Sequence, residues 1–332
     1  SVRKAFLLTE PATNPPRATL VIAAWNASAT IDGAVQSALA QTIPIEVIVV
    51  DDASTDDTAA RVAAHTDAAP HHLTLLRQDT NQGPAAARNR AIDESRAPWI
   101  AVLDADDLMA PDRLERLITQ AETVGLDFLA DDIEKVDQSD PDGPRTRLWS
   151  DTPIGTLPID ATLFVQSNIP DGRGERREMG FLKPVMRRAF LDEHALRYSE
   201  TIRLGEDYDL YARALILGAR FQLVDPRGYL ALVRPNSLSG QHPTSAHADL
   251  MTADRHMLAM PQTLPATKAA LRAHLLEQHK KWAWRSLIDA VRERRFGAAL
   301  RCFIAPVPVV INLKARLAAD IWQRLTQKMR SR

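Results

Sequence analysis

The sequence predicts an α/β fold, with a mostly parallel, doubly wound sheet flanked by helices and a helical extension at the C-terminus. The first observation is that short apolar runs alternate with segments of helical period between Thr19 and Ala121. The second is that acidic residues follow two of these runs, at 51–52 and 104–107. The third is a change of charge along the chain, from an acidic first part to a basic last part.

Four apolar runs bounded by polar residues predict strands of this sheet. They are Thr19–Trp25, Glu46–Asp52, Leu73–Arg77 and Trp99–Leu103. Apolar residues at helical spacing, or residues typical of helix starts, predict a helix after each strand. These helices lie near 31–39, 56–64 and 83–95 and from 111 onward. Farther along, the sequence predicts helices at 187–194, 207–217 and 244–332, with a break at 305–308, and strands at 220–224 and 228–233.

Composition places the chain among ordinary globular proteins and excludes several other classes. Of its 332 residues, 45% are hydrophobic and 25% are charged, which excludes a wholly disordered or collagen-like chain. The single cysteine, Cys302, excludes an intramolecular disulfide framework and a Cys-rich zinc site. No run of 18 apolar residues occurs, and residues 1–16 lack the apolar core of a signal peptide, so a cytoplasmic location is expected.

Charge divides the chain near Met251. From Met251 to the end there are 16 Lys and Arg residues against 5 Asp and Glu residues, whereas the formal net charge of the whole chain is −1. We therefore expect residues 244–332 to form a separate basic helical region, and the Pro- and Thr-containing residues 1–16 to form a flexible arm. A net charge near zero and the lack of a nucleic-acid-binding motif argue against a nucleic-acid partner.

The segment Asp104-Ala105-Asp106-Asp107 is the first motif with possible chemistry, because it lies between a predicted strand and a helix that begins at Pro111. In doubly wound sheets, ligands bind beyond the carboxyl ends of the strands. Carboxylate oxygens suit Mg²⁺ or Mn²⁺, and such an ion keeps positions open for phosphate oxygens. The alternative is that these aspartates only cap the helix that begins near Pro111.

Three further motifs place polar residues at the ends of predicted elements. Asp51 or Asp52, at the end of the second strand, can accept a hydrogen bond from a base imide or cap the next helix. Arg88 follows small residues and can reach a base or phosphate, or lie on the surface of a helix. Glu206 and Asp207 open a predicted helix, where they supply a general base or are an acidic pair favoured by the helix dipole.

Together and in this order, these motifs resemble the family 2 inverting glycosyltransferases of the GT-A fold. The resembling stretches are VIAAWNAS, ALAQT, EVIVVDDASTDDT, NQGPAAARNRAI, WIAVLDADDLMAPDRL and GEDYDLYARAL. The later segment that begins FLKPVMRRAFL is similar to the bacterial exopolysaccharide branch, such as the succinoglycan glucosyltransferases. The resemblance implies a catalytic domain over 17–243, with a nucleotide-binding half at 17–110 and an acceptor half at 111–243.

The resemblance implies where the nucleotide base of the donor binds. The backbone around Ala23 and Ala24, with the ring of Trp25, would flank the base. Asp51, or with slightly less preference Asp52, would hold the imide of a uracil.

It also implies which residues surround the ribose, the metal and the diphosphate. Arg88 would lie near the base or ribose, and Asp104 would contact the ribose. Asp106 would ligate a Mn²⁺ or Mg²⁺ ion that bridges the two phosphates. Asp107 would not bind the ion directly but would support the residues that do. Arg234, after the last predicted strand, would close over the diphosphate.

The implied reaction is a single displacement at the anomeric carbon of the sugar. Asp207 would take the proton of the attacking acceptor hydroxyl, with Glu206 supporting it, while the metal stabilises the departing diphosphate. The expected donor is UDP-glucose and the acceptor a glycan or lipid-linked saccharide. No Q-x-x-R-W motif follows the Glu-Asp pair, which favours transfer of one sugar at a time. The competing hypotheses are a sugar nucleotidyltransferase and an inactive nucleotide-sugar-binding subunit of a polysaccharide assembly complex.

The basic C-terminal region mixes Lys and Arg with Trp, Leu and Ile at helical spacing. One such stretch surrounds Trp282 and Trp284, and a second surrounds Trp322. Basic amphipathic helices with Trp can lie on anionic membranes, so a peripheral position on the inner face of the cell membrane is one expectation. The other is that the apolar faces pack on the catalytic domain or on a second subunit.

Overall fold

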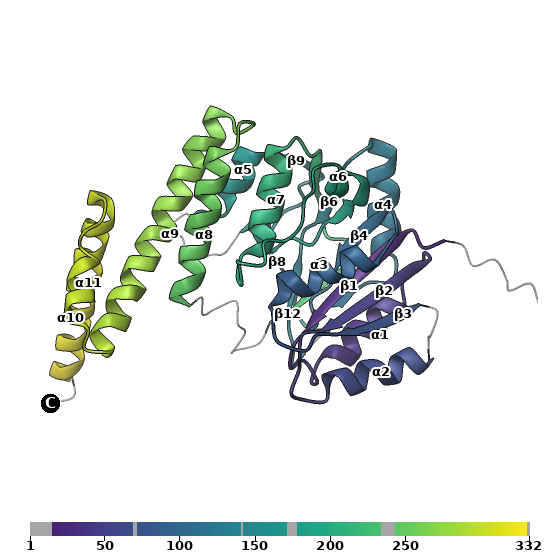
Figure 1. Cartoon of the computed structure of the whole chain (residues 1–332), viewed down its shortest axis with the longest axis horizontal. Coiled ribbons are helices and arrows are strands. Elements are labelled where there is room, and N and C mark those ends of the chain that lie inside the picture. Colours follow the sequence, from purple (N-terminus) through teal and green to yellow (C-terminus); the bar gives the residue numbers. More distant parts are fainter. Residues whose placement is uncertain (1–14, 69–71, 141, 171–177, 234–242, 331–332) are drawn as a thin grey trace, which may run out of the picture.

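The computed structural model describes residues 15–68, 72–140, 142–170, 178–233 and 243–330. In this part of the chain the central element is an eight-stranded sheet flanked by helices, as the sequence predicts (Figure 1). Its strands, in spatial order, are β3 (Leu73–Arg77), β2 (Ile45–Asp51), β1 (Ala18–Ala24), β4 (Trp99–Val102), β10 (Val185–Arg187), β6 (Phe128–Asp131), β11 (Phe221–Val224) and β9 (Thr156–Ile159).

The sheet is mostly parallel, which confirms the predicted fold class. Strands β3, β2, β1 and β4 run parallel to one another, and so do β6 and β11. Two strands run the other way: β10 lies between β4 and β6, and β9 lies at the edge beside β11. The sequence did not predict β6, β9 or β10.

The register of β1 brings the acidic motifs to one edge of the sheet. Ala24 pairs with Asp51 on β2, and Val21 pairs with Val102 on β4. Asp104 follows two residues beyond Val102. Since β1 lies between β2 and β4, both acidic motifs leave the sheet at the same carboxyl edge, as predicted.

Helices cover the sheet and carry the connections between strands. They are α1 (Ile31–Leu39), α2 (Thr58–Ala68), α3 (Pro84–Glu94), α4 (Arg113–Val124), α5 (Ala161–Ser167), the 3₁₀ helix η1 (Met179–Phe181), α6 (Arg188–Glu193) and α7 (Glu206–Ile216). The four-stranded second sheet has the order β5 (Leu108–Met109), β12 (Tyr229–Val233), β7 (Glu134–Asp137) and β8 (Thr146–Arg147). Of these four strands the sequence predicted only β12.

A fully buried ion pair ties α4 to the segment that leads to β10. The guanidinium of Arg113 donates to Oδ1 of Asp131 at 2.6 and 2.9 Å, and also donates to the backbone oxygen of Lys183 at 2.6 Å. The other oxygen of Asp131 accepts from the backbone N–H of Arg227 at 2.8 Å. Arg113 therefore fixes the backbone of Lys183, two residues before β10 begins.

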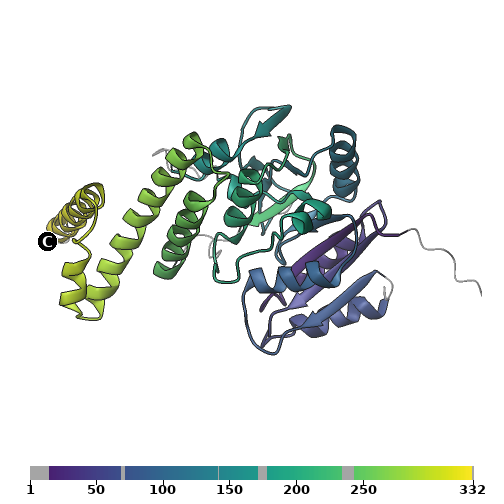
Figure 2. The ribbon, with the colours of Figure 1, turned by 45° about the horizontal axis from the view of Figure 1, so that its top comes forward.

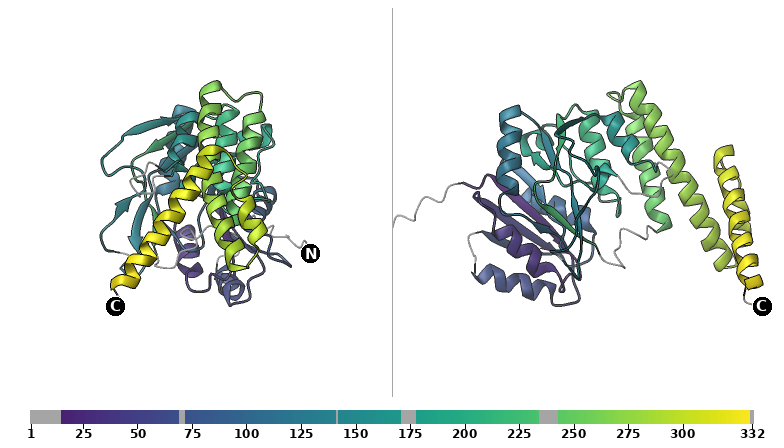
Figure 3. Two further views of the ribbon diagram at one scale, coloured as in Figure 1. Left: turned by 90° about the vertical axis from the view of Figure 1, so that its left-hand side faces the viewer. Right: turned by 180° about the vertical axis from the view of Figure 1, so that it is seen from behind.

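The C-terminal region is helical, as predicted, and consists of α8 (Thr244–Ala259), α9 (Pro265–Arg292), α10 (Phe296–Arg301) and α11 (Val307–Arg330). Figure 2 shows these helices extending from the end of the molecule opposite to β1–β3. Helix α8 and the first half of α9 contribute Leu250, Met257 and Leu271 to the main hydrophobic core. The C-terminal half of α9 packs instead with α10 and α11 around a second, smaller core (Figure 3).

Two details of this region differ from the prediction. The chain also breaks at 260–264 and 293–295, and Pro308 lies in the first turn of α11, where proline is tolerated. None of the helices in the ranges given above is long and apolar enough to cross a membrane. The division into an arm, a two-part catalytic domain and a basic region stays a prediction.

Candidate active site

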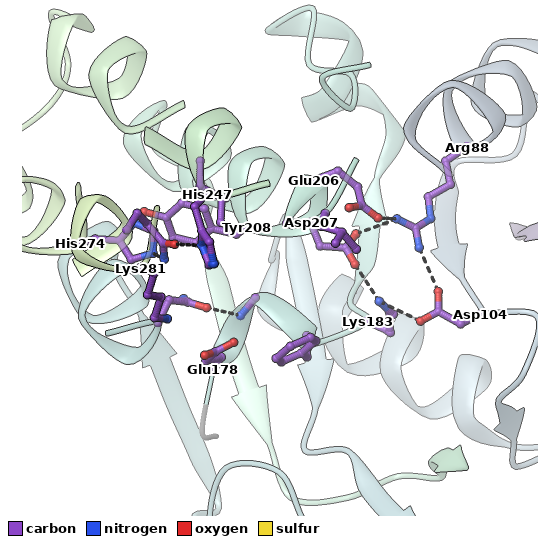
Figure 4. A pocket seen from close by; sticks show the side chains of 17 residues that line it. Arg88, Asp104, Glu178, Lys183, Glu206, Asp207, Tyr208, His247, His274 and Lys281 are labelled. Carbon is purple, nitrogen blue, oxygen red and sulfur yellow. Dashed lines mark hydrogen bonds and ion pairs between the residues drawn. The ribbon is translucent and has the colours of Figure 1, made fainter. Parts of the chain in front are cut away.

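A cavity of about 250 Å³ lies between the first turn of α7 and the helices α8 and α9. On one side it reaches Arg88, Asp104, Lys183, Glu206 and Asp207, and on the other it reaches His247, His274 and Lys281 (Figure 4). The cavity therefore joins the carboxyl edge of the sheet to the C-terminal helices.

Five charged side chains form one network on the sheet side of this cavity. Arg88 donates to Oε1 of Glu206 at 2.6 Å and to Oδ1 of Asp104 at 2.9 Å. Lys183 donates to Oδ2 of Asp207 at 2.7 Å and lies 3.2 Å from Oδ2 of Asp104. The two cations thus bridge the motif after β4 to the acidic pair of α7, although these segments lie about 100 residues apart in the sequence.

The pKa values of this network follow from burial and charge. Burial alone would raise the pKa of Asp104, but Lys183 and Arg88 hold it below its ordinary value. Burial raises the pKa of Glu206, and the charge of Arg88 only partly offsets this effect. Burial would lower the pKa of Lys183, yet Asp104 and Asp207 raise it above its ordinary value, so this amine stays charged.

A glycine positions the acidic pair of α7. Gly205 precedes α7 with φ 89°, a conformation that other residues seldom adopt. A Cβ atom at this position would lie 2.7 Å from a methyl carbon of Leu250 on α8. The positive φ therefore favours glycine at the position from which α7 begins with Glu206 and Asp207.

Asp107 supports the turn after β4. Its carboxylate accepts from the hydroxyl of Tyr229 at 2.9 Å and from the backbone N–H of Leu232 at 3.0 Å. The same hydroxyl accepts from the backbone N–H of Asp104 at 3.2 Å. Burial, and then the charges of Asp104 and Asp106, raise the pKa of Asp107 to about 8. Asp107 thus fastens this turn to β12.

The loops after β1 and β2 hold each other. Backbone N–H groups of Asn26 and Ala27 donate to the hydroxyls of Ser54 and Thr58 at 2.9 and 2.8 Å. Ala53, in the loop after β2, has φ 59°, a strained conformation for alanine that costs about 1 kcal/mol or more. Strain of this kind persists where surrounding contacts fix the backbone, so these loops are rigid before any ligand binds.

Beside these loops, Trp25 and the two aspartates of β2 lie in different surroundings. Ala24 ends β1 with 2% exposure, after the half-buried Ala23, whereas Trp25 is 53% exposed just beyond it. Asp51 is fully buried, and its Oδ2 atom accepts no hydrogen bond from any described residue, although Nε of Arg77 lies 3.6 Å away. An unsatisfied buried carboxylate oxygen is costly unless a ligand donates to it.

Asp52 has a different set of partners. Its carboxylate accepts from the backbone N–H groups of Gln82 and Gly83 at 2.8 and 2.7 Å, and from the side chain of Gln78. These contacts fix the start of α3, which carries Arg88. The carboxylate of Asp52 is therefore already satisfied within the protein, whereas that of Asp51 is not.

The turn after β4 fits a divalent cation with few protein ligands. Asp104 and Asp106 are both half-buried carboxylates, and the two oxygens of Asp104 already lie beside Arg88 and Lys183. The residues described in the structure contain no group of three His, Cys, Asp or Glu side chains arranged to hold a metal. One or two carboxylates suffice for Mg²⁺ when phosphate oxygens of a substrate complete the coordination, so the residues present fit such an ion.

The structure brings in residues that the sequence reasoning missed. Lys183 lies in the segment FLKPV, and no site role was predicted for it. A lone lysine in an apolar stretch is nevertheless a signal for a buried, paired charge. Arg88 was expected beside the base or ribose, and in the structure it lies between Asp104 and Glu206. Arg234 lies outside the described residues.

The far wall of the cavity is a chain of buried polar groups on α7, α8 and α9. The hydroxyl of Tyr208 donates to Asp254 at 2.8 Å, and Nδ1 of His274 lies 2.8 Å from the other oxygen of Asp254. The amide of Gln278 donates to Nε2 of His274 at 3.0 Å and accepts from Nδ1 of His247 at 2.8 Å. These bonds fix the orientation of both imidazoles, so the C-terminal helices supply a preorganised polar wall.

Comparisons with known proteins show the family of the chain. The sequence profile of "Glycosyl transferase family 2" matches residues 19–180. The chain is 47% identical over 302 residues to the succinoglycan biosynthesis protein ExoU of Rhizobium meliloti, covering 90% of this chain and 86% of that protein.

Two further similarities are narrower in what they establish. Over 105 residues, 31% of this chain and 41% of the relative, the chain is 36% identical to an Escherichia coli protein, the UDP-Glc:alpha-D-GlcNAc-diphosphoundecaprenol beta-1,3-glucosyltransferase WfaP. The crystal structure of S. aureus TarS residues 1–349 in complex with UDP superposes with a TM-score of 0.62 at 18% identity, covering 90% of this chain and 89% of that one, which establishes the fold. By its full-length similarity to ExoU and its matching profile, the chain belongs to glycosyl transferase family 2.

Proposed function

We propose that this protein transfers one sugar at a time, with inversion, from a UDP-sugar to a hydroxyl of a glycan or lipid-linked saccharide in bacterial exopolysaccharide synthesis. The observation that carries the proposal is the position of Asp207, at the boundary between the ion network and the cavity lined by α8 and α9. The names of ExoU and of the UDP-glucose-dependent relative support the pathway and make UDP-glucose the first donor to test.

The donor nucleotide binds at the carboxyl ends of β1 and β2. The exposed ring of Trp25 stacks on the base, next to the backbone of Ala23 and Ala24. The unsatisfied Oδ2 atom of Asp51 accepts from the imide N–H of a uracil. Asp52 contributes indirectly, because it holds the start of α3.

The diphosphate binds beside the turn after β4. Asp104 contacts the ribose and Asp106 holds a Mn²⁺ or Mg²⁺ ion, while Arg88 orients Asp104. When bound, the ion supplies Lewis-acid stabilisation of the negative charge on the departing diphosphate. Arg234, beyond the described ranges, is proposed to close over the phosphates.

Asp207 acts as the general base. Its carboxylate takes the proton of the acceptor hydroxyl as that oxygen bonds to the anomeric carbon, and the bond between this carbon and the diphosphate oxygen breaks. Lys183 and Tyr211 hold the carboxylate in place, at 2.7 and 3.4 Å from its oxygens. Glu206, held by Arg88, lies on the acceptor side. Because attack and departure occur on opposite faces, the centre is inverted.

The acceptor enters the cavity between Asp207 and the polar wall of α8 and α9. That wall offers imidazole, amide and ammonium groups, the chemistry that binds sugar hydroxyls and anionic substituents. The basic C-terminal helices are proposed to take the chain to the inner face of the cell membrane.

A binding screen separates this proposal from its alternatives. Thermal unfolding is measured with UDP, GDP, UDP-glucose and other nucleotide sugars, with and without Mn²⁺. We expect a rise in Tm that is specific for UDP compounds and requires Mn²⁺, since a ligand at 100 times its Kd stabilises by about 2.7 kcal/mol.

Product analysis then distinguishes the enzyme classes. A glycosyltransferase releases UDP from UDP-glucose when an acceptor is present. Consumption of UTP with release of pyrophosphate would identify a sugar nucleotidyltransferase, and Mn²⁺-dependent UDP binding without any UDP release would identify an inactive subunit.

A further inference from the structure

The helices α10 and α11 expose an apolar surface that the proposed catalytic chemistry does not use. Within sixteen residues, five large apolar side chains have exposed fractions of 62–84%. They are Phe296, Leu300, Ile304, Val307 and Ile311, and together they are called the apolar strip below. Two of them, Leu300 and Ile304, are 72% and 84% exposed, more than any other large apolar residue of the described chain. Several large exposed apolar side chains within one short segment indicate an interaction site.

The strip is not simply an unpacked end of the chain. The opposite face of α11 carries Val309 and Leu313, both fully buried against α9 and α10 in the second core. The ring of Phe303 and the buried thiol of Cys302 also pack in that core. The two helices therefore have a packed inner face that fixes them, and an outer face that presents the strip to the surroundings.

Positive charge borders the strip. Residues 291–330 contain nine Lys and Arg residues against two acidic residues. Arg292, Arg294 and Arg301 precede or accompany α10, and Lys314 and Arg316 follow on α11, all of them exposed. In a two-fold symmetric dimer, this surface of one copy would pack on the same surface of the other copy. The cations of the two copies would then lie close together and repel one another. An anionic lipid surface complements both the apolar side chains and their positive border.

We infer that the apolar strip inserts into the interfacial region of an anionic phospholipid bilayer, with the surrounding Lys and Arg side chains on the lipid headgroups. The long helix α9 connects this surface rigidly to the catalytic cavity. Lys281 lines the cavity and Val291 lies ten residues farther along the same helix, close to α10. At 1.5 Å per residue, this spacing is about 15 Å.

Such a spacing has a consequence for the acceptor. A lipid-linked saccharide long enough to span this spacing would reach the cavity while its lipid stays in the bilayer. Figures 1 and 3 show α10 and α11 at the end of the molecule farthest from β1–β3, so these three strands would lie far from the bilayer. This role in acceptor delivery rests on the proposed function, whereas membrane binding itself stands on the strip alone.

The test is flotation of the full chain with two kinds of vesicle, phosphatidylcholine alone and phosphatidylcholine with about 30% phosphatidylglycerol. We expect binding to the anionic vesicles that weakens at high salt, because each cation near an anionic surface contributes about fivefold to partitioning. The variants Leu300→Glu and Ile304→Glu should each lower partitioning about tenfold or more, since an apolar contact is replaced by a like charge.

Leu264→Glu is the matched control. Leu264 is 68% exposed at the other end of α9, remote from the strip, so the same substitution there should leave vesicle binding within twofold. The charge variant Arg301→Gln should weaken binding to anionic vesicles about fivefold, and Arg272→Gln, on the upper part of α9, should not.

Three results would overturn the inference: no flotation with anionic vesicles, equal loss of binding in Leu264→Glu and Leu300→Glu, or a solution dimer that Leu300→Glu splits into monomers. The last result would assign the strip to a second copy of the chain. UDP release from the donor is measured on the same variants without vesicles. Vesicle binding without UDP release would contradict the proposed transferase activity but not the membrane inference. UDP release without vesicle binding would contradict the membrane inference but not the transferase activity.

Discussion

Lys183→Met removes one of the two cations that hold the acidic residues of the site. In the wild-type protein this amine lies 2.7 Å from Asp207 and 3.2 Å from Asp104, and the residue is 5% exposed. Without it, the three carboxylates of Asp104, Glu206 and Asp207 face Arg88 alone. Loss of one partner of a buried charge pair costs about 3–5 kcal/mol. The side chain of Asp104 is 32% exposed, so water weakens its attraction to Lys183. We therefore expect a loss of unfolding free energy at the lower end of this range, about 3 kcal/mol.

The assay is urea unfolding of the wild type and of the variants Lys183→Met, Asp207→Asn and the double variant. If the two residues belong to one charge network, their effects on the free energy of unfolding should not add. The decrease in the double variant should be smaller than the sum of the two single decreases by at least about 1 kcal/mol. Lys280→Met is the matched control, because Lys280 forms only a part-exposed pair with Glu277 and should cost less than about 0.5 kcal/mol. A loss below about 1 kcal/mol for Lys183→Met, or strict additivity in the double variant, would refute the reasoning.

Three further outcomes are expected. Asp106→Ala should reduce Mn²⁺-stimulated UDP release about 100-fold or more, and release that is independent of metal or survives this change would remove Asp106 as the ligand. Trp25→Ala should raise the KM for the donor about tenfold with kcat nearly unchanged, because base stacking contributes about 1–3 kcal/mol; an unchanged KM would place the base elsewhere. Burial, and then the charges of Lys281 and Arg285, lower the pKa of His247 below 6.5, so the unfolded chain binds more protons and the free energy of unfolding falls as the pH drops below 6.5. His247→Gln should make this fall less steep, which unfolding curves between pH 5 and 8 would test; an equally steep fall would contradict it.

The first half of the fold could be predicted from the sequence because its signals are local. Strands β1 to β4 are apolar runs of four to seven residues, and α3 begins at Pro84 behind Gly83, a typical helix start. The rule that ligands bind at the carboxyl ends of parallel strands then placed Asp51 and Asp104 on one edge of the sheet, as the structure confirms.

The second half depends on contacts that no local pattern encodes. Strand β10 has three residues, and its antiparallel position between β4 and β6 is set by long-range packing and by the buried contact of Arg113 with the backbone of Lys183. The same segment brings Lys183 to Asp207. The sequence identified Glu206 and Asp207 by their place at a helix start, but no local pattern showed that Lys183 pairs with Asp207.

The polar wall on α8 and α9 was missed for a related reason. The wall is spread over two helices, and each helix taken alone has the composition of an ordinary amphipathic helix. Its residues are His247, Asp254, His274 and Gln278. Only the packing of α8 against α9 makes them a buried chain beside the cavity. Residues of α8 and α9 therefore line the cavity, which no local pattern indicated.

The central claim is that Asp207 accepts the proton of the acceptor hydroxyl. The most direct measurement compares UDP release and UDP affinity for the wild type, Asp207→Asn and Asp209→Asn. Asp209 lies in the same turn of α7, is equally buried, and pairs with Arg213 instead of lining the cavity, so it controls for loss of a carboxylate in this helix. We predict that Asp207→Asn lowers kcat about 10²- to 10⁴-fold at unchanged UDP affinity, while Asp209→Asn stays within tenfold of the wild type. Transfer by Asp207→Asn within tenfold of the wild-type rate would contradict the account.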